Sequence, residues 1–258
     1  MRTPFLFKSY KPPEALKKAG FKVYCSLCVH RHIDPETFGS VLSLMMCPNP
    51  KVTLSRRRGD ALIDRARSME ASRFLLKTDA DILLFIDDDI CFEPSEVVRM
   101  LTDMQEQELD IVGAPYVLKQ DGGGHLTTKL LPENKEILLG KDGKIEQVRA
   151  VATGCMAIHR RVLEKMATTM PLCSMGNGEN FYPFFQPFPK YLEENKKWVY
   201  ASEDWAACLR AEDLGFKIWL DCRVTLKHAG RYLYTIGDLG RPPKVEPENL
   251  VYRESFGD

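Results

Sequence analysis

Apolar residues gather into short continuous runs along the chain, and the stretches between them have a helical period. The run Ile82–Ile86 holds five apolar residues in succession, which is typical of a strand covered on both faces. Asp34 followed by Pro35 is a typical helix start. The order strand, helix, strand predicts an α/β fold with a mainly parallel sheet and helices on both faces. We predict strands over residues 21–29, 51–54, 82–86 and 110–117, and helices over 35–46, 59–76 and 93–107.

The pattern changes after Lys119. Residues 126–158 predict the strands of a hairpin, broken by the turn-forming residues 141–144. Residues 171–197 are rich in glycine, asparagine, proline and aromatic residues without a clear period, so we expect a mobile loop near a site. We also predict a loop over 120–124, a helix over 160–168, a helix over 202–214 with Ser202 as N-cap and Gly215 as its end, and strands over 217–220 and 223–227.

Charge and hydropathy exclude some classes of protein. The 36 basic and 36 acidic side chains cancel, so no overall field attracts nucleic acid or an anionic membrane. No apolar stretch reaches the roughly 20 residues of a membrane span. The N-terminus is too short and too charged to be a signal peptide. We therefore expect a cytoplasmic protein without a membrane span.

The eight cysteines are scattered, and Cys25 and Cys28 alone have a C-x-x-C spacing. This spacing occurs in zinc and redox sites, but a structural zinc site needs a second ligand pair, and none follows at a suitable spacing. The other interpretation is that both thiols are buried, because they lie within the apolar run 21–29.

Three consecutive aspartates, Asp87, Asp88 and Asp89, follow the run 82–86 directly. Carboxylates this close repel one another unless a cation or hydrogen-bond donors offset their charge. Oxygen ligands suit Mg²⁺ or Mn²⁺, which keep open positions for phosphate oxygens. On a strand, Asp87 and Asp89 would face one side and Asp88 the other. The alternative is that the aspartates form only a turn ahead of the helix at Pro94.

The segment Phe85–Pro94 resembles the D-x-D segment of GT-A-type glycosyltransferases, particularly small bacterial and bacteriophage ones. In that family the last aspartate binds the metal, and the first approaches the sugar or ribose of the nucleotide donor. The resemblance implies Asp89 as a metal ligand, Asp87 as a donor contact and further metal ligand, and Asp88 as an auxiliary or sugar contact. Residues 79–81 also spell D-x-D, but they precede the strand, where a turn is expected.

Three further motifs extend the resemblance to about residues 20–235. Arg67 lies in a segment that resembles a helix motif near the nucleotide, although Ser68 replaces the family's asparagine. Glu203 and Asp204 resemble an acceptor-facing pair at a helix start, where the helix dipole lowers a carboxyl pKa; plain helix capping is the alternative. His228, in His-Ala-Gly, resembles the family's remaining metal ligand; the alternative is an ordinary core or surface histidine.

Loops at the carboxyl ends of strands carry ligands in open α/β sheets, so Cys28 and His30 are candidate donor-binding residues. Lys119 either offers a charge to phosphate or is a solvated residue at a strand end. Gly154 begins a segment that resembles the family's strand beneath the acceptor site, where glycine allows close backbone approach; the alternative is an ordinary bulge.

The chain of 258 residues, 44% of them hydrophobic, is long enough for one large domain. The resemblance implies a single GT-A (nucleotide-diphospho-sugar transferase, Rossmann-like) domain with a mainly parallel central sheet and a smaller mixed sheet. The expected parts are an N-terminal leader (1–20), a nucleotide-sugar-binding half (21–118), an acceptor-binding half of the same domain (119–235) and a C-terminal tail (236–258).

The implied activity is that of a metal-dependent, hexosyltransferase-like glycosyltransferase using Mn²⁺ or Mg²⁺ and, by resemblance, a UDP-sugar. Asp204 would take the acceptor proton in an inverting displacement, although a retaining enzyme could carry the same metal ligands. The acceptor stays open among a glycan, a protein, a small molecule and a hydroxylated DNA base. One alternative is a nucleotidyltransferase, whose usual Gly-rich loop is missing from residues 30–35; another is a non-catalytic nucleotide-sugar-binding module.

Overall fold

The computed structural model describes residues 20–119, 125–133, 136–176, 178–193, 196–230, 232–239 and 249–253. Residues 1–19 of the expected leader, the loop 120–124 and most of the tail lie outside these residues. The helices are α1 (Pro35–Met45), α2 (Ile63–Lys77), α3 (Pro94–Glu106), α4 (Arg160–Ala167) and α5 (Glu203–Asp213), with a 3₁₀ turn at Ile236–Asp238. The strands are β1 (Lys22–Val29), β2 (Lys51–Arg58), β3 (Ile82–Asp87), β4 (Ile90–Cys91), β5 (Ile111–Gly113), β6 (Glu136–Gly140), β7 (Ile145–Val148), β8 (Cys155–His159), β9 (Cys173–Ser174), β10 (Asn180–Phe181), β11 (Phe188–Leu192), β12 (Lys197–Ala201), β13 (Ile218–Asp221), β14 (Lys227–Ala229), β15 (Leu233–Tyr234) and β16 (Asn249–Arg253).

The main sheet of the described residues has seven strands in the order β2-β1-β3-β8-β5-β13-β7. β1 is parallel to β2 and β3, and β13 is parallel to β5. β8 is antiparallel to both of its neighbours, and β7 is antiparallel to β13. Only β8 and β7 therefore oppose the other strands, and the predicted mainly parallel sheet is confirmed. A smaller sheet, β15-β14-β4, is antiparallel throughout.

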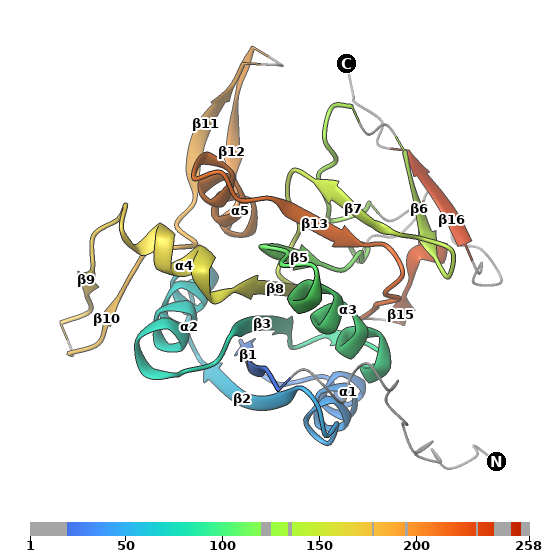
Figure 1. Ribbon diagram of the computed structural model, residues 1–258, viewed down its shortest axis with the longest axis horizontal. Coiled ribbons are helices and arrows are strands. Elements are labelled where there is room, and N and C mark those ends of the chain that lie inside the picture. The colour runs from blue at the N-terminus through green and yellow to red at the C-terminus, as the bar shows by residue number, and fades with distance from the viewer. Residues whose placement is uncertain are drawn as a thin grey trace.

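Helices cover both faces of the main sheet, as predicted (Figure 1). One hydrophobic cluster joins the sheet to α1 and α3, and the other joins it to α2, α4 and α5. The side chains of β3 alternate between the two, with Leu83 and Phe85 in one cluster and Ile82, Leu84 and Ile86 in the other. This placement explains why β3 is apolar at every position before its end.

Several predicted elements differ from the structure. The prediction of a hairpin over 126–158 is wrong, because β6 and β7 do not pair with each other. β6 pairs with β16, and β7 pairs with β13. Helix α2 begins at Ile63 rather than residue 59, since Gly59 has a φ of 79° that a helix does not accommodate. β2 is longer than predicted, β5 is shorter, and residues 223–226 are not a strand.

The middle of the aromatic segment 171–197 is packed against the main sheet. Phe184 and Phe185 are fully buried, and the Phe185 ring meets that of Phe85 edge-on with centroids 5.3 Å apart. The backbone N–H of Phe185 donates to Ser68 Oγ at 3.0 Å. The short strands β9 to β11 give the segment regular structure, while the expected mobility near a site stays a prediction. The segment continues into the β11–β12 hairpin, which projects beyond α5 (Figure 1).

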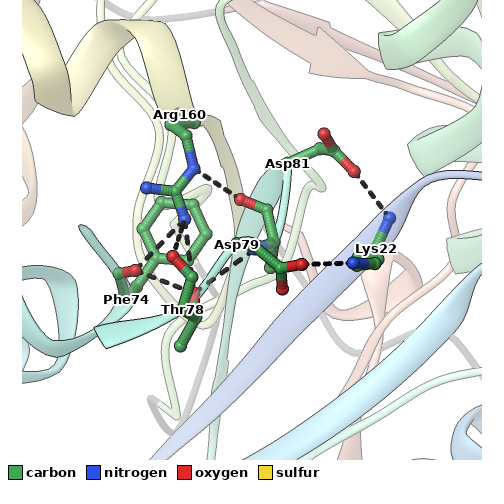
Figure 2. A network of polar contacts seen from close by, with 7 residues as sticks. Lys22, Phe74, Thr78, Asp79, Asp81 and Arg160 are labelled. Carbon is green, nitrogen blue, oxygen red and sulfur yellow. Dashed lines mark hydrogen bonds and ion pairs between the residues drawn. The ribbon is translucent and has the colours of Figure 1, made fainter. Parts of the chain in front are cut away.

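A polar network closes the end of the sheet where β3 begins (Figure 2). The Asp81 carboxylate accepts from the backbone N–H of Lys22 at 2.7 Å, and Asp79 forms an ion pair with the Lys22 ammonium. These two aspartates are therefore a helix-to-strand turn, as predicted, and not a second metal motif. Arg160 completes the network by donating to the backbone oxygens of Phe74, Leu75, Thr78 and Ala80.

No helix among the described residues is long and apolar enough to cross a membrane.

Candidate functional site

The carboxyl end of β3 and the start of β8 meet at one edge of the main sheet. Asp87 is the last residue of β3, lies opposite Cys28 of β1, and donates its backbone N–H to the oxygen of Gly154 at 3.1 Å. Asp88 and Asp89 lie in the turn between β3 and β4. The predicted strand-like alternation therefore does not hold, and each of the three carboxylates has different partners.

Asp89 is held by residues from two distant parts of the chain. Its Oδ1 lies 3.4 Å from His228 Nε2, and its Oδ2 forms an ion pair with the Lys119 ammonium. Its backbone oxygen accepts from the N–H of Ala229 at 2.7 Å, because β14 pairs with β4. Burial alone would raise the pKa of Asp89, but His228 and Lys119 outweigh it and hold the pKa below its ordinary value.

The His228 ring is fixed by its other nitrogen. Nδ1 lies 2.8 Å from the backbone oxygen of Val117, and the ring stands edge-on to Tyr116 with centroids 5.3 Å apart. A carbonyl oxygen only accepts hydrogen bonds, so Nδ1 carries the proton. The neutral ring, with no proton on Nε2, is the form that binds a metal ion, whereas the contact of Nε2 with Asp89 Oδ1 needs a proton on Nε2.

Two ligands alone do not complete a metal site. Among the described residues, no group of three or more histidine, cysteine, aspartate or glutamate side chains is placed to hold a metal. Asp87, the third predicted ligand, has its Oδ1 bound to Arg67 instead. Mg²⁺ and Mn²⁺ commonly take one or two protein ligands together with phosphate and water. The Asp89 and His228 pair fits such an ion, and the Lys119 ammonium shows that this carboxylate already accepts a cation.

Arg67 links the candidate donor contact Asp87 to the candidate acceptor-facing residue Glu203. Its guanidinium is buried and donates to Asp87 Oδ1 at 2.7 Å and to Glu203 Oε1 at 2.5 Å. Burial disfavours the charge of Arg67, but the carboxylates of Asp87 and Glu203 more than compensate and raise its pKa. The start of α5 is thereby tied to the end of β3.

Glu203 and Asp204 form the first turn of α5 but differ in their surroundings. Burial raises the pKa of Glu203, although Arg67 opposes the shift, so the predicted lowering by the helix dipole is wrong for this residue. Asp204 Oδ1 accepts from the backbone N–H of Trp205 at 2.8 Å and from Ser202 Oγ at 2.5 Å. Ser202 stands at the predicted N-cap position, but its side chain makes no capping hydrogen bond.

Two cavities open beside this edge of the sheet, and His30 lines both. Asp88 Oδ2 accepts from the backbone N–H of His30 at 3.2 Å, and burial raises the pKa of Asp88. The smaller cavity, about 160 Å³, is bordered by Cys28, Arg57 and Asp60. The larger, about 350 Å³, is lined by His30, Arg31, His32, Asp34, Asp88, Asp89, Lys119, Ala229 and Gly230.

The cysteine pair does not form a zinc site. Cys25 and Cys28 belong to the hydrophobic clusters on opposite faces of the sheet, so their thiols point away from each other. Burial raises the pKa of each to about 12, which leaves both as thiols at neutral pH. The interpretation as two buried strand residues is confirmed.

The structure also contains contacts that the sequence analysis missed. Tyr116 is buried, and its hydroxyl accepts from the backbone N–H of Gly154 at 3.2 Å. A Cβ on Gly154 would lie 2.5 Å from the Tyr116 ring, so the glycine does permit a close approach. His32 and Asp34 line the larger cavity. Their only signal in the sequence was their position in the loop after the first strand.

Comparison with known proteins gives a partial match. Residues 71–167 match the family model of glycosyl transferase family 2, a stretch that contains the three aspartates and Gly154 but ends before α5. No curated protein matches the chain. Among solved structures, A197 from STIV is similar at 16% identity and a TM-score of 0.49, over 82% of this chain and 93% of that one. GalNAc-T7, solved with UDP, GalNAc and Mn²⁺, is similar at 12% identity and a TM-score of 0.44, over 81% of this chain and 44% of that one. The partial match to the model of glycosyl transferase family 2 supports a glycosyl transfer function.

Proposed function

We propose that this protein is a metal-dependent glycosyltransferase that moves a sugar from a UDP-sugar to an acceptor hydroxyl. The observation that supports it is the convergence of Asp87, Asp89, His228 and Glu203 on one edge of the sheet. Each comes from a motif that resembles the same family, and the contacts join motifs that lie far apart in the sequence.

The donor lies along the ends of β1 and β3 in this proposal. Asp89 and His228 Nε2 hold Mn²⁺ or Mg²⁺, which when bound offsets the negative charge of the leaving diphosphate. Asp87, oriented by Arg67, contacts the ribose or sugar of the donor. Cys28 and His30, at the wall of the smaller cavity beside Asp87, contact the nucleoside. Asp88 fastens the loop after β1 through the backbone of His30, so its role is to position the donor site.

The acceptor lies at the start of α5. Asp204 Oδ1 is held by Trp205 and Ser202, while Oδ2 has no hydrogen bond to any described residue. That second oxygen takes the acceptor proton as the hydroxyl attacks the sugar. Glu203 acts through Arg67 and sets the position of α5 relative to β3. The displacement is inverting, and retention of configuration, read from proton NMR coupling constants of the product, would remove Asp204 as the base.

The test uses purified protein, Mn²⁺ and a panel of UDP-sugars, with and without candidate acceptors. Release of UDP by the wild type and its loss in Asp89→Asn and Asp204→Asn are expected. Asp79→Asn is the matched control, because that aspartate belongs to the other D-x-D sequence, at the opposite end of β3. Release of pyrophosphate from UTP and a sugar 1-phosphate, with no release of UDP from the UDP-sugars, would identify a nucleotidyltransferase. Binding of UDP-sugar without any turnover across the panel would favour a binding module.

A further inference from the structure

Each oxygen of the Asp89 carboxylate has its own partner. Oδ1 faces His228 Nε2, and Oδ2 is paired with the ammonium of Lys119. About a third of each side chain in the Asp89–Lys119 pair is exposed, at 32% and 31%. The pair is thus partly shielded from water but still open to the larger cavity, which both residues line.

The position of the Lys119 side chain is built into the fold. A Cβ on Gly230 would lie 3.1 Å from Lys119 Cδ, so the lysine stem rests against backbone that carries no side chain. His228, two residues earlier, is hydrogen-bonded to Val117, two residues before Lys119. The same two segments therefore deliver both the histidine and the lysine to Asp89.

A divalent ion and an ammonium cannot both occupy this carboxylate at contact distance without strong repulsion. Lys119 has a flexible four-carbon stem and a compact charge, so it can leave Asp89 without a change in the backbone. The larger cavity is also lined by Arg31, whose guanidinium is a further cation for a ligand with several negative charges.

We propose that Lys119 is an internal counter-cation of Asp89, which a divalent metal displaces, and that the released ammonium then binds the diphosphate of the donor. This inference rests on the proposed function, because it takes Asp89 as a metal ligand. It makes metal and nucleotide binding mutually dependent: the metal frees the lysine for the diphosphate, and the diphosphate keeps the lysine away from the metal.

The test is titration calorimetry of two ligands against the wild type and Lys119→Met. Without the competing ammonium, Lys119→Met should bind Mn²⁺ alone about fivefold more tightly than the wild type does. Added salt should reduce this difference in Mn²⁺ affinity between the two proteins. With saturating Mn²⁺, the same variant should bind UDP about tenfold more weakly, because the diphosphate loses a cation. The two changes in affinity have opposite signs, whereas the loss of a purely structural role of Lys119 would weaken the binding of both Mn²⁺ and UDP.

Two controls separate the possible failures. Lys190→Met removes a lysine that pairs with Asp213 at 2.7 Å and does not line the cavity, and it should change neither affinity. Asp89→Asn should abolish binding of Mn²⁺; unchanged Mn²⁺ affinity there would overturn the proposed metal site itself. If Asp89→Asn abolishes binding but Lys119→Met does not tighten it, the counter-cation role alone is refuted. Unchanged UDP affinity in Lys119→Met would refute the transfer of the lysine to the diphosphate.

Discussion

Replacement of Arg67 by methionine removes the link between the end of β3 and the start of α5. The guanidinium side chain is 6% exposed, against 26% for Asp87 and 20% for Glu203, so the variant leaves two partly buried carboxylates without their shared partner. Removal of one member of a buried ion pair costs about 3–5 kcal/mol. Because both carboxylates keep some contact with water, we expect a loss near the lower end, about 3 kcal/mol in the free energy of unfolding.

The pH dependence of that loss is set by Glu203. Burial already raises its pKa, and without Arg67 the pKa rises further above the value in the unfolded chain. The native state of the variant then holds a proton that the unfolded state releases, so its stability falls as pH rises through the raised pKa. The loss relative to the wild type should therefore be largest near neutral pH and shrink as the pH approaches about 5.

Urea unfolding at several pH values measures both effects, as a lower midpoint with an unchanged dependence on denaturant. The double variant Arg67→Met, Glu203→Gln is the control. It replaces the unpaired Glu203 carboxylate with a neutral amide, which should recover part of the lost free energy of unfolding. A loss that is independent of pH and unaffected by Glu203→Gln would mean that Arg67 acts through packing alone, and would refute the electrostatic reasoning.

Three further outcomes test the site and its support. Asp204→Asn should keep donor affinity in calorimetry while turnover falls about a hundredfold or more; weaker donor binding with normal turnover would move Asp204 to the donor site. Gly154→Ala should destabilise the protein by about 1–3 kcal/mol in urea unfolding, since its Cβ would lie 2.5 Å from the Tyr116 ring, whereas Gly39→Ala in α1, which meets nothing within 4 Å, should not destabilise it. Hydrogen exchange should find the Phe185 amide protected without any ligand; rapid exchange would contradict its burial.

Features with local signals could be predicted from the sequence. Asp34 caps α1 by accepting from the backbone of Glu36, and Gly215 follows α5 with a φ of 89°, both as expected from neighbouring residues. The apolar run of β3 and the aspartates after it also reveal a buried strand and a polar end without reference to the rest of the chain. Such signals come from a few adjacent side chains, so the structures they predict do not depend on tertiary contacts.

Features that depend on distant partners could not be predicted in this way. The alternation in β6 and β7 indicates strands but not which strands they pair with, so the predicted hairpin failed. A sequence does not reveal that Arg67 meets both Asp87 and Glu203, because the bridge needs α2, β3 and α5 already in place. The burial that raises the pKa of Glu203 comes from the same assembly and outweighs the local helix dipole.

The two side chains that contact the Asp89 carboxylate are synthesised at different times. Lys119 follows Asp89 by 30 residues, whereas His228 belongs to β14 near the end of the described chain. At roughly 5–20 residues per second, the ribosome adds the lysine many seconds before the histidine. Throughout that interval the nascent chain holds Lys119 but lacks both His228 and Gly230, against which the lysine stem rests. The cluster around Asp89 is therefore assembled only when β14 has joined β4, late in the synthesis of the chain.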